Sequence, residues 1–218
     1  MKILNLYSGI GGNRKLWGDE HEITAVELDP QIAKIYQDFF PNDKVIITDA
    51  HQYLLEHFKE FEFIWSSPPC PSHSIFRKGF SCANSAKPLY PDMKLYEEIF
   101  FLKYYFDGKW VVENVRSYYE PLIFPQELQR HFFWANFFIA PRKFQKDSIR
   151  LTGGKFNNDD CNDEIQIKRL EDKYGYKLKY YKLGKTKTRT LLRNCVMPEL
   201  GLHILNESKR DIQSELFR

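Results

Sequence analysis

The stretch ILNLYSGIGG, residues 3–12, decides the fold because it joins an apolar run directly to a glycine-rich turn. Residues 3–7 are typical of a buried strand, and the glycines predict a tight turn into a short helix around residues 14–17. Glycines at a strand-to-helix turn let a ligand approach the backbone and expose N–H groups at the start of the helix. The spacing is not a complete GxGxxG, so the motif alone is weak evidence for a nucleotide site.

The same alternation of apolar and amphipathic segments continues through the first 140 residues. Short apolar runs predict further strands at residues 22–27, 45–48, 61–65, 110–113 and 132–139. Amphipathic segments between them predict helices at residues 30–40, 52–58 and 91–106. Strands separated by helices form βαβ units, so we expect an α/β fold with a doubly wound, Rossmann-like, mostly parallel sheet.

Beyond Pro141 the pattern is less regular. Clusters of Gly, Asn, Asp, Lys and Thr predict loops at residues 153–154, 157–160 and 184–188. A helix is predicted over residues 163–174, and a last helix follows Pro198.

The composition is that of a globular protein, with 43% hydrophobic and 16% aromatic residues among 218. No stretch resembles a membrane span or a secretory signal, so we expect a soluble, cytosolic protein. The four cysteines form no CxxC pair and the six histidines are scattered. This pattern argues against a disulfide framework and against a metal site.

The net charge of +3 is unevenly distributed along the chain. Residues 142–193 contain 15 Lys and Arg against 7 Asp and Glu, a net of +8, so the rest of the chain is acidic. Aromatic rings interleave with these cations at Tyr174, Tyr176, Tyr180 and Tyr181. Such a segment suits a polyanion, because cations neutralise phosphates and rings stack on bases. Charge alone slightly favours the simpler interpretation, an ordinary solvated surface.

Five residues that could carry chemistry fall at the carboxyl ends of successive predicted strands. They are Gly9, Glu27, Asp49, Cys70 and Glu113. Ligands of open α/β sheets bind at that edge, so one shared site explains the pattern better than five separate accidents.

The two acids nearest the glycine turn suit a nucleotide. Glu27 lies 18 residues after Gly9, where an acid of a nucleotide-binding βαβ unit accepts hydrogen bonds from ribose hydroxyls. Asp49 is placed to accept a hydrogen bond from an adenine amino group. Its alternative role is the N-cap of the next helix.

Cys70 and Glu113 are the two residues with reactive potential. Cys70 follows Pro68 and Pro69, which end the preceding strand and place the thiol at its tip. Taken alone, Cys70 would be interpreted as a packed cysteine. Glu113 ends an apolar strand, where a carboxylate is costly unless it is paired or protonated.

Together these motifs resemble the cytosine-C5 DNA methyltransferase family, which uses S-adenosylmethionine. The matches occur in family order and extend from Ile3 to about Leu205. Residues 7–12 resemble the glycine motif, 68–70 the Pro-Pro-Cys nucleophile motif, 113–115 the Glu-Asn-Val motif, 125–130 the Gln-x-Arg-x-Arg motif, and 193–196 the C-terminal Gly-Asn-x-Val element.

The resemblance implies a role for each matched residue. S-adenosylmethionine, which leaves as S-adenosylhomocysteine, would contact Tyr7, Gly9, Ile10, Gly11, Gly12, Glu27, Leu28, Asp49, Ala50, Pro69, Asn194 and Val196. Cys70 would be the nucleophile, Glu113 the proton donor to cytosine N3, and Arg130 the cation that positions both. DNA contacts would come from Ser74, Arg77, Lys78, Lys179, Lys182, Lys185, Lys187 and Arg189. The segment from Ser72 to Tyr90 has the length of a loop that closes over a flipped base.

Four positions depart from the family pattern. Tyr7 replaces the usual Phe, Pro71 the Gln after the nucleophile, Leu128 the first Arg of its motif, and Arg193 a Gly. The recognition segment is also short. We expect a catalytic domain of residues 1–141 and 190–218, and a reduced target-recognition segment of residues 142–189.

The resemblance implies a DNA (cytosine-5-)-methyltransferase acting through a Cys70 adduct in the cytoplasm of a bacterium or a phage-infected cell. The short recognition segment suggests help from a second copy or an accessory subunit. The alternatives are an RNA or nucleotide cytosine methyltransferase, a non-catalytic DNA-binding relative or subunit, and transfer of a group other than methyl. The residues do not specify the target sequence.

Overall fold

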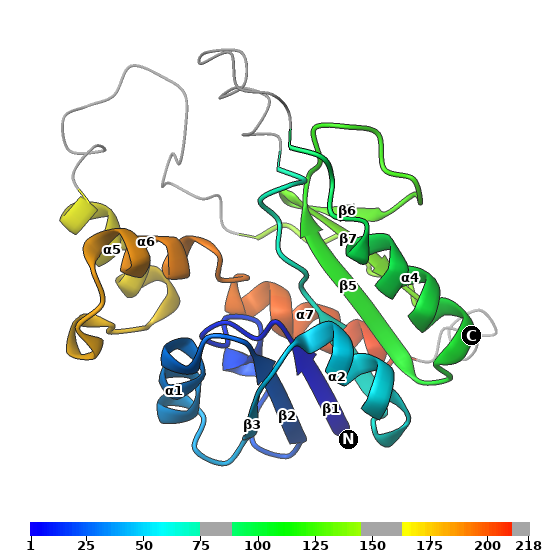
Figure 1. Cartoon of the computed structure of the whole chain (residues 1–218), viewed down its shortest axis with the longest axis horizontal. Coiled ribbons are helices and arrows are strands. Elements are labelled where there is room, and N and C mark those ends of the chain that lie inside the picture. Colours follow the sequence, from blue (N-terminus) through cyan, green and yellow to red (C-terminus); the bar gives the residue numbers. More distant parts are fainter. Residues whose placement is uncertain (75–88, 145–162, 211–218) are drawn as a thin grey trace.

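The computed structural model describes residues 1–74, 89–144 and 163–210 (Figure 1). Its centre is a seven-stranded sheet in the order β3-β2-β1-β4-β5-β7-β6. The strands are β1 (Lys2–Leu6), β2 (Glu22–Glu27), β3 (Lys44–Ile47), β4 (Phe63–Ser66), β5 (Lys109–Val115), β6 (Gln126–Leu128) and β7 (His131–Ala135). The pairs from β3 to β5 are parallel, whereas β7 runs antiparallel to both β5 and β6. The predicted α/β fold with a mostly parallel sheet is confirmed.

The helices fall between the strands, as the alternation predicts. The α-helices are α1 (Pro30–Phe39), α2 (Ala50–His57), α4 (Lys94–Tyr105), α5 (Asp163–Tyr174), α6 (Lys185–Arg193) and α7 (Pro198–Ser208). Single 3₁₀ turns are η1 (Arg14–Leu16), η2 (Phe58–Glu60) and η4 (Lys179–Tyr181). No helix within the described ranges is both long enough and apolar enough to cross a membrane.

Several predicted boundaries were wrong. Strand β5 extends to Val115, two residues beyond Glu113, which was expected to end it. The loop predicted at residues 184–188 is the start of α6, with Gly184 at its N-cap; Gly is tolerated there, so the cluster marks a helix start. Strand β7 ends at Ala135 instead of continuing to residue 139, and α4 begins at Lys94 instead of residue 91. The loops predicted at residues 153–154 and 157–160 lie outside the described residues.

Two apolar cores cover the two faces of the sheet. Successive strand residues point to opposite faces, so Leu4 and Ile64 pack with α2 and α4, whereas Ile3, Phe63 and Trp65 pack with α7 and with the Trp17 ring that follows η1. Burial on both faces explains why these strands read as continuous apolar runs. It also leaves the carboxyl ends of the strands as the edge where polar side chains gather.

A third core attaches α5 and α6 to α1, as Figure 1 shows at one side of the sheet. Leu170 and Leu192 pack there with Ile10, which follows the glycine turn, and with Ile35 of α1. The described part of the expected recognition segment therefore packs directly against the glycine turn and the helix that follows β2.

Candidate active site

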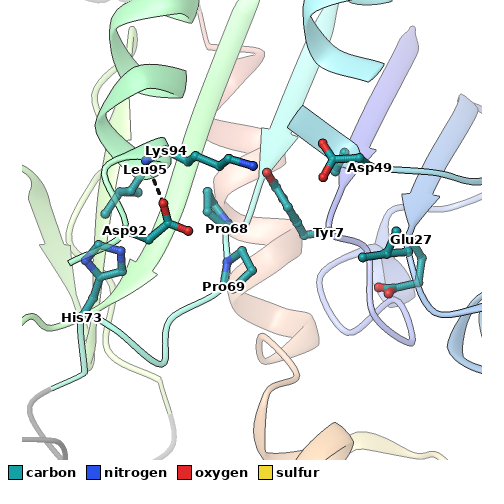
Figure 2. A pocket seen from close by; sticks show the side chains of 11 residues that line it. Tyr7, Glu27, Asp49, Pro68, Pro69, His73, Asp92, Lys94 and Leu95 are labelled. Atoms are coloured by element: carbon teal, nitrogen blue, oxygen red, sulfur yellow. Dashed lines mark hydrogen bonds between the residues drawn. The ribbon is translucent and has the colours of Figure 1, made fainter. Parts of the chain in front are cut away.

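Two adjoining cavities, each of about 310 Å³, open at the carboxyl ends of the parallel strands. They share four lining residues: Tyr7, Glu27, Pro68 and Pro69. Figure 2 shows the first cavity, with Tyr7 between Asp49 on one side and Pro68 on the other. The second cavity contains Cys70 and Glu113. The structure thus places Glu27, Asp49, Cys70 and Glu113 around adjoining cavities at this edge.

Most of the residues expected to bind a cofactor line one cavity or the other. The first is lined by Tyr7, Glu27, Leu28, Asp49, Ala50 and Pro69. The second is lined by Tyr7, Gly9, Ile10, Gly12, Glu27, Pro69, Asn194 and Val196. Gly11 differs, because a Cβ there would meet the Phe40 ring at 2.3 Å. Its φ of +80° and its packing against α1 account for the glycine without a ligand.

The glycine turn and Glu27 hold each other. Gly9 has a φ of +55°, and its N–H donates to Glu27 Oε2 at 3.0 Å. The other carboxylate oxygen, Oε1, accepts from Asp29 N at 3.0 Å. A Cβ on Gly9 would meet nothing within 4 Å, so the space above this residue is open. Glu27 is therefore fixed in direction while its carboxylate still faces the cavities.

Asp49 combines the two roles that the sequence left open. Its Oδ1 accepts from Gln52 N at 2.9 Å, which makes it the N-cap of α2, and the residue also lines the first cavity. A carboxylate that caps a helix with one oxygen can accept from a ligand with the other.

Sequence reasoning missed a buried carboxylate beneath the first cavity. Glu98 of α4 is completely buried and accepts hydrogen bonds from Tyr7 Oη at 2.6 Å and Ser66 Oγ at 2.6 Å. His51 Nδ1 lies 3.1 Å from Glu98 Oε1, and this contact raises the pKa of His51. These partners come from the turn after β1, from β4 and from α2, so Glu98 connects segments around the cavity. Glu98 falls within an amphipathic helix pattern, and nothing in that pattern distinguishes it from a surface acid.

The nucleophile candidate Cys70 is half-buried in the second cavity. Asn114 Nδ2 donates to Pro68 O at 3.0 Å, so the strand that carries Glu113 also holds the segment that carries Cys70. Burial raises the pKa of the Cys70 thiol, and the Glu113 carboxylate raises it further. The resemblance pointed to the cation Arg130 as the charged partner of Cys70, whereas the charge that acts on the thiol is the Glu113 carboxylate.

Glu113 contacts a residue that the sequence analysis did not select. His131 Nδ1 lies 2.9 Å from Glu113 Oε1, and His131 lines the same cavity. Arg130, the expected partner, is the neighbour of His131 in the turn before β7, and its charge acts on Arg193. The Gln-x-Arg-x-Arg resemblance drew attention to Arg130. An adjacent histidine at a strand start gave no comparable signal.

Three cations predicted to contact DNA form ion pairs within the chain. Lys187 Nζ lies 2.7 Å from Asp29, Lys185 Nζ lies 2.5 Å from Glu164, and Arg189 pairs with Asp163. Lys179 and Lys182 lie at η4 and just after it, with Lys179 over the Tyr180 ring. The count of basic residues therefore overstates the positive charge available to a ligand.

The remaining DNA-contact predictions concern the segment after Cys70. Ser74 forms an isolated antiparallel bridge with Ser117. Next to it, His73 is buried, and its Nδ1 lies 2.6 Å from Tyr119 Oη. Arg77 and Lys78, with most of the predicted loop, lie outside the described residues.

Comparisons with known proteins concern the family of the chain. The model of the C-5 cytosine-specific DNA methylase family matches residues 1–116. The Type II methyltransferase M.Bsp6I of Bacillus sp. (strain RFL6) is 31% identical over 100 residues, which make up 44% of this chain and 31% of that protein. The chain therefore matches about a third of the length of that relative.

Solved structures resemble the chain in fold. Entamoeba histolytica methyltransferase EhMeth aligns with a TM-score of 0.54 at 10% identity, over 95% of this chain and 97% of that one. Spodoptera frugiperda DNMT2 (E260A/E261A/K263A mutant) is 27% identical over 52% of this chain and 35% of its own, with a TM-score of 0.36. The Entamoeba protein supports a methyltransferase-like fold over nearly the whole chain.

Proposed function

Because this chain belongs to the C-5 cytosine-specific DNA methylase family, we propose that it transfers a methyl group from S-adenosylmethionine to C5 of a cytosine in DNA. The observation that carries the proposal is the joining of two cavities. One presents Asp49 and the other presents Cys70 with Glu113, and Tyr7 and Glu27 line both. A cofactor in one cavity and a base in the other could therefore meet at the residues that line both.

The residues of the site fit S-adenosylmethionine. Glu27 and Asp49 offer carboxylate oxygens to ribose hydroxyls and to the adenine amino group. Ser8 lines the second cavity, and its buried Oγ has no hydrogen-bond partner within the described ranges. A buried hydroxyl of this kind calls for a polar ligand group, such as the carboxylate of the methionine moiety. S-adenosylmethionine, when bound, supplies an electrophilic methyl group.

Cys70 and Glu113 would each activate the cytosine base in a different way. Cytosine C5 is a poor nucleophile, so Cys70 Sγ would add to C6 and shift the electrons of the C5–C6 double bond toward C5. A protonated Glu113 would donate a hydrogen bond to N3 and stabilise the charge that develops on the ring. After C5 takes up the methyl group, loss of the C5 proton expels Cys70 as thiolate.

The electrostatics of the cavity couple these two residues. A negative Glu113 raises the pKa of Cys70, so thiolate formation becomes easier once that carboxyl carries a proton toward N3. His131 Nδ1 lies 2.9 Å from Glu113 Oε1 without hydrogen-bond geometry, so His131 is close enough to limit where the carboxyl can turn.

The test is to incubate the purified protein with S-adenosylmethionine and unmethylated genomic DNA, then measure 5-methylcytosine in the digested nucleosides. We expect product from the wild type and none from Cys70→Ala, whose cofactor affinity by calorimetry should be unchanged. A parallel reaction contains total RNA in place of DNA. Product on RNA alone would move the substrate assignment to RNA. No product on either, with cofactor bound, would contradict the proposed activity.

A further inference from the structure

We propose that Arg193 binds a phosphate of the DNA strand whose cytosine enters the catalytic cavity, an inference that rests on the proposed function. Arg193 is the last residue of α6 and lines the cavity that contains Cys70 and Glu113. The resembling family motif has Gly at this position. The guanidinium therefore departs from the resembling motif and lies at the cavity that contains Cys70 and Glu113.

Arg193 lies among other cations. Partial burial lowers the pKa of its guanidinium, and Arg189 and Arg130 lower it further. Arg189 has an acidic partner in Asp163. Arg193 forms no ion pair within residues 1–74, 89–144 and 163–210. A guanidinium that lies near like charges and has no ion-pair partner of its own in the described residues costs free energy, which a bound anion would offset.

A phosphodiester is the anion that the proposed substrate brings to this place. A nucleotide whose base reaches Cys70 carries its own phosphates to the opening of the same cavity. Guanidinium groups bind phosphate well, because their planar set of N–H donors matches two phosphate oxygens at once. Lys185, Lys187 and Arg189 are already paired with acids, so Arg193 is better prepared than they are to accept a phosphate.

The competing explanation is local to the helix. A cation in the last turn of a helix interacts favourably with the helix dipole. That role predicts a lower melting temperature when Arg193 is replaced, and an unchanged affinity for DNA. The two explanations therefore differ in what is measured.

The experiment follows binding of a fluorescein-labelled DNA duplex by anisotropy over a series of KCl concentrations. Arg193→Gly restores the residue of the family motif, Arg193→Lys keeps the charge, and Lys44→Ala removes a cation at the opposite end of the sheet. For Arg193→Gly we expect affinity to fall about tenfold at low salt, and the slope of log Kd against log salt to decrease by about 0.9. Arg193→Lys should keep the wild-type slope, and Lys44→Ala should match the wild type throughout.

Controls distinguish loss of the phosphate contact from misfolding of the variant and from failure of the proposed function. Calorimetric affinity for S-adenosylmethionine and the melting temperature report whether Arg193→Gly is folded. Equal slopes and equal affinities for wild type and Arg193→Gly overturn the phosphate contact, even if the wild type methylates DNA. A wild type that binds no DNA overturns both proposals. If Arg193→Gly changes the slope on labelled RNA and not on labelled DNA, the phosphate contact stands and the substrate is RNA instead of DNA.

A second measurement locates the phosphate once sequencing of methylated DNA has defined the target. Single phosphates around the target cytosine are replaced by uncharged methylphosphonates. When the contacted phosphate is the one replaced, wild type and Arg193→Gly should bind the DNA equally, because the substitution in the DNA has already removed the interaction. If every position keeps the tenfold difference, Arg193 does not contact a phosphate near the target.

Discussion

The hydroxyl of Tyr7 donates a 2.6 Å hydrogen bond to Oε1 of Glu98, a carboxylate that is completely buried. Tyr7 also has a φ of +54°, an uncommon conformation for a residue other than glycine. The hydrogen bond thus holds a strained residue at the start of the glycine turn. It gives a physical reason for a tyrosine where the related family has phenylalanine.

Replacement of Tyr7 by Phe should destabilise the fold. Glu98 would lose one of its donors, and a buried polar group that loses a hydrogen-bond partner costs about 1–3 kcal/mol. Urea unfolding followed by circular dichroism measures the difference in the free energy of unfolding. Tyr104→Phe is the matched control, because Tyr104 is exposed and stacks on Phe100. Equal stability of the two variants would contradict a supporting role for the Tyr7 hydroxyl.

The fold was predictable because buried parallel strands and amphipathic helices leave strong periodic signals. The positions of Glu27, Asp49, Cys70 and Glu113 followed, since the carboxyl ends of parallel strands share one edge. Their partners were not predictable: pairs such as Glu98 with Tyr7 join residues far apart in the sequence. Nothing local marks the acid as buried or the tyrosine as its donor.

The basic segment shows a different limit of sequence reasoning. A count of charges cannot tell a free lysine from one that is paired. Lys187 and Asp29 are 158 residues apart, and their ion pair depends on the packing of α6 against α1. In the sequence Arg193 stands out only as a departure from a motif, although its side chain lines the cavity that contains Cys70 and Glu113.

Cys70 should react slowly with iodoacetamide near neutral pH, because burial and Glu113 raise the pKa of its thiol. Only the thiolate reacts, so the alkylation rate should still be rising at pH values where an unperturbed thiol, with a pKa of about 8.5, has levelled off. Glu113→Gln removes one cause of the shift and should speed alkylation at mildly alkaline pH. Mass spectrometry of the Cys70 peptide measures the rate at this residue alone. An identical pH profile for wild type and Glu113→Gln would show that the two groups are not coupled.

His131 should matter for turnover and not for cofactor binding. Its Nδ1 lies 2.9 Å from Glu113 Oε1, so His131→Ala leaves that carboxyl free to turn away from the base. Misplacement of a catalytic group by about 1 Å can cost roughly a hundredfold in rate, and we expect a loss of that order in single-turnover methylation. His131→Arg keeps a nitrogen-bearing side chain beside the carboxyl and should retain more activity.

The control for this prediction is His57→Ala, which removes a histidine that pairs with Glu60 on the surface of α2. It should methylate at the wild-type rate. A His131→Ala enzyme as fast as the His57→Ala control would leave His131 with a structural role only. A parallel loss of S-adenosylmethionine affinity would point to general disruption of the site.

Glu27→Gln should weaken S-adenosylmethionine binding. The carboxylate lines both cavities and is held by Gly9 N and Asp29 N, so the substitution removes a charged acceptor from ligand hydroxyls while keeping the side chain's size. Hydrogen bonds to a charged group contribute about 1.5–3 kcal/mol, which corresponds to a loss of affinity of roughly 10- to 150-fold in calorimetry. Glu22→Gln, at the other end of the same strand, is the matched control and should bind like the wild type. If Glu27→Gln binds the cofactor as tightly as that control, the ribose assignment of Glu27 is wrong, and its role is confined to fixing the glycine turn.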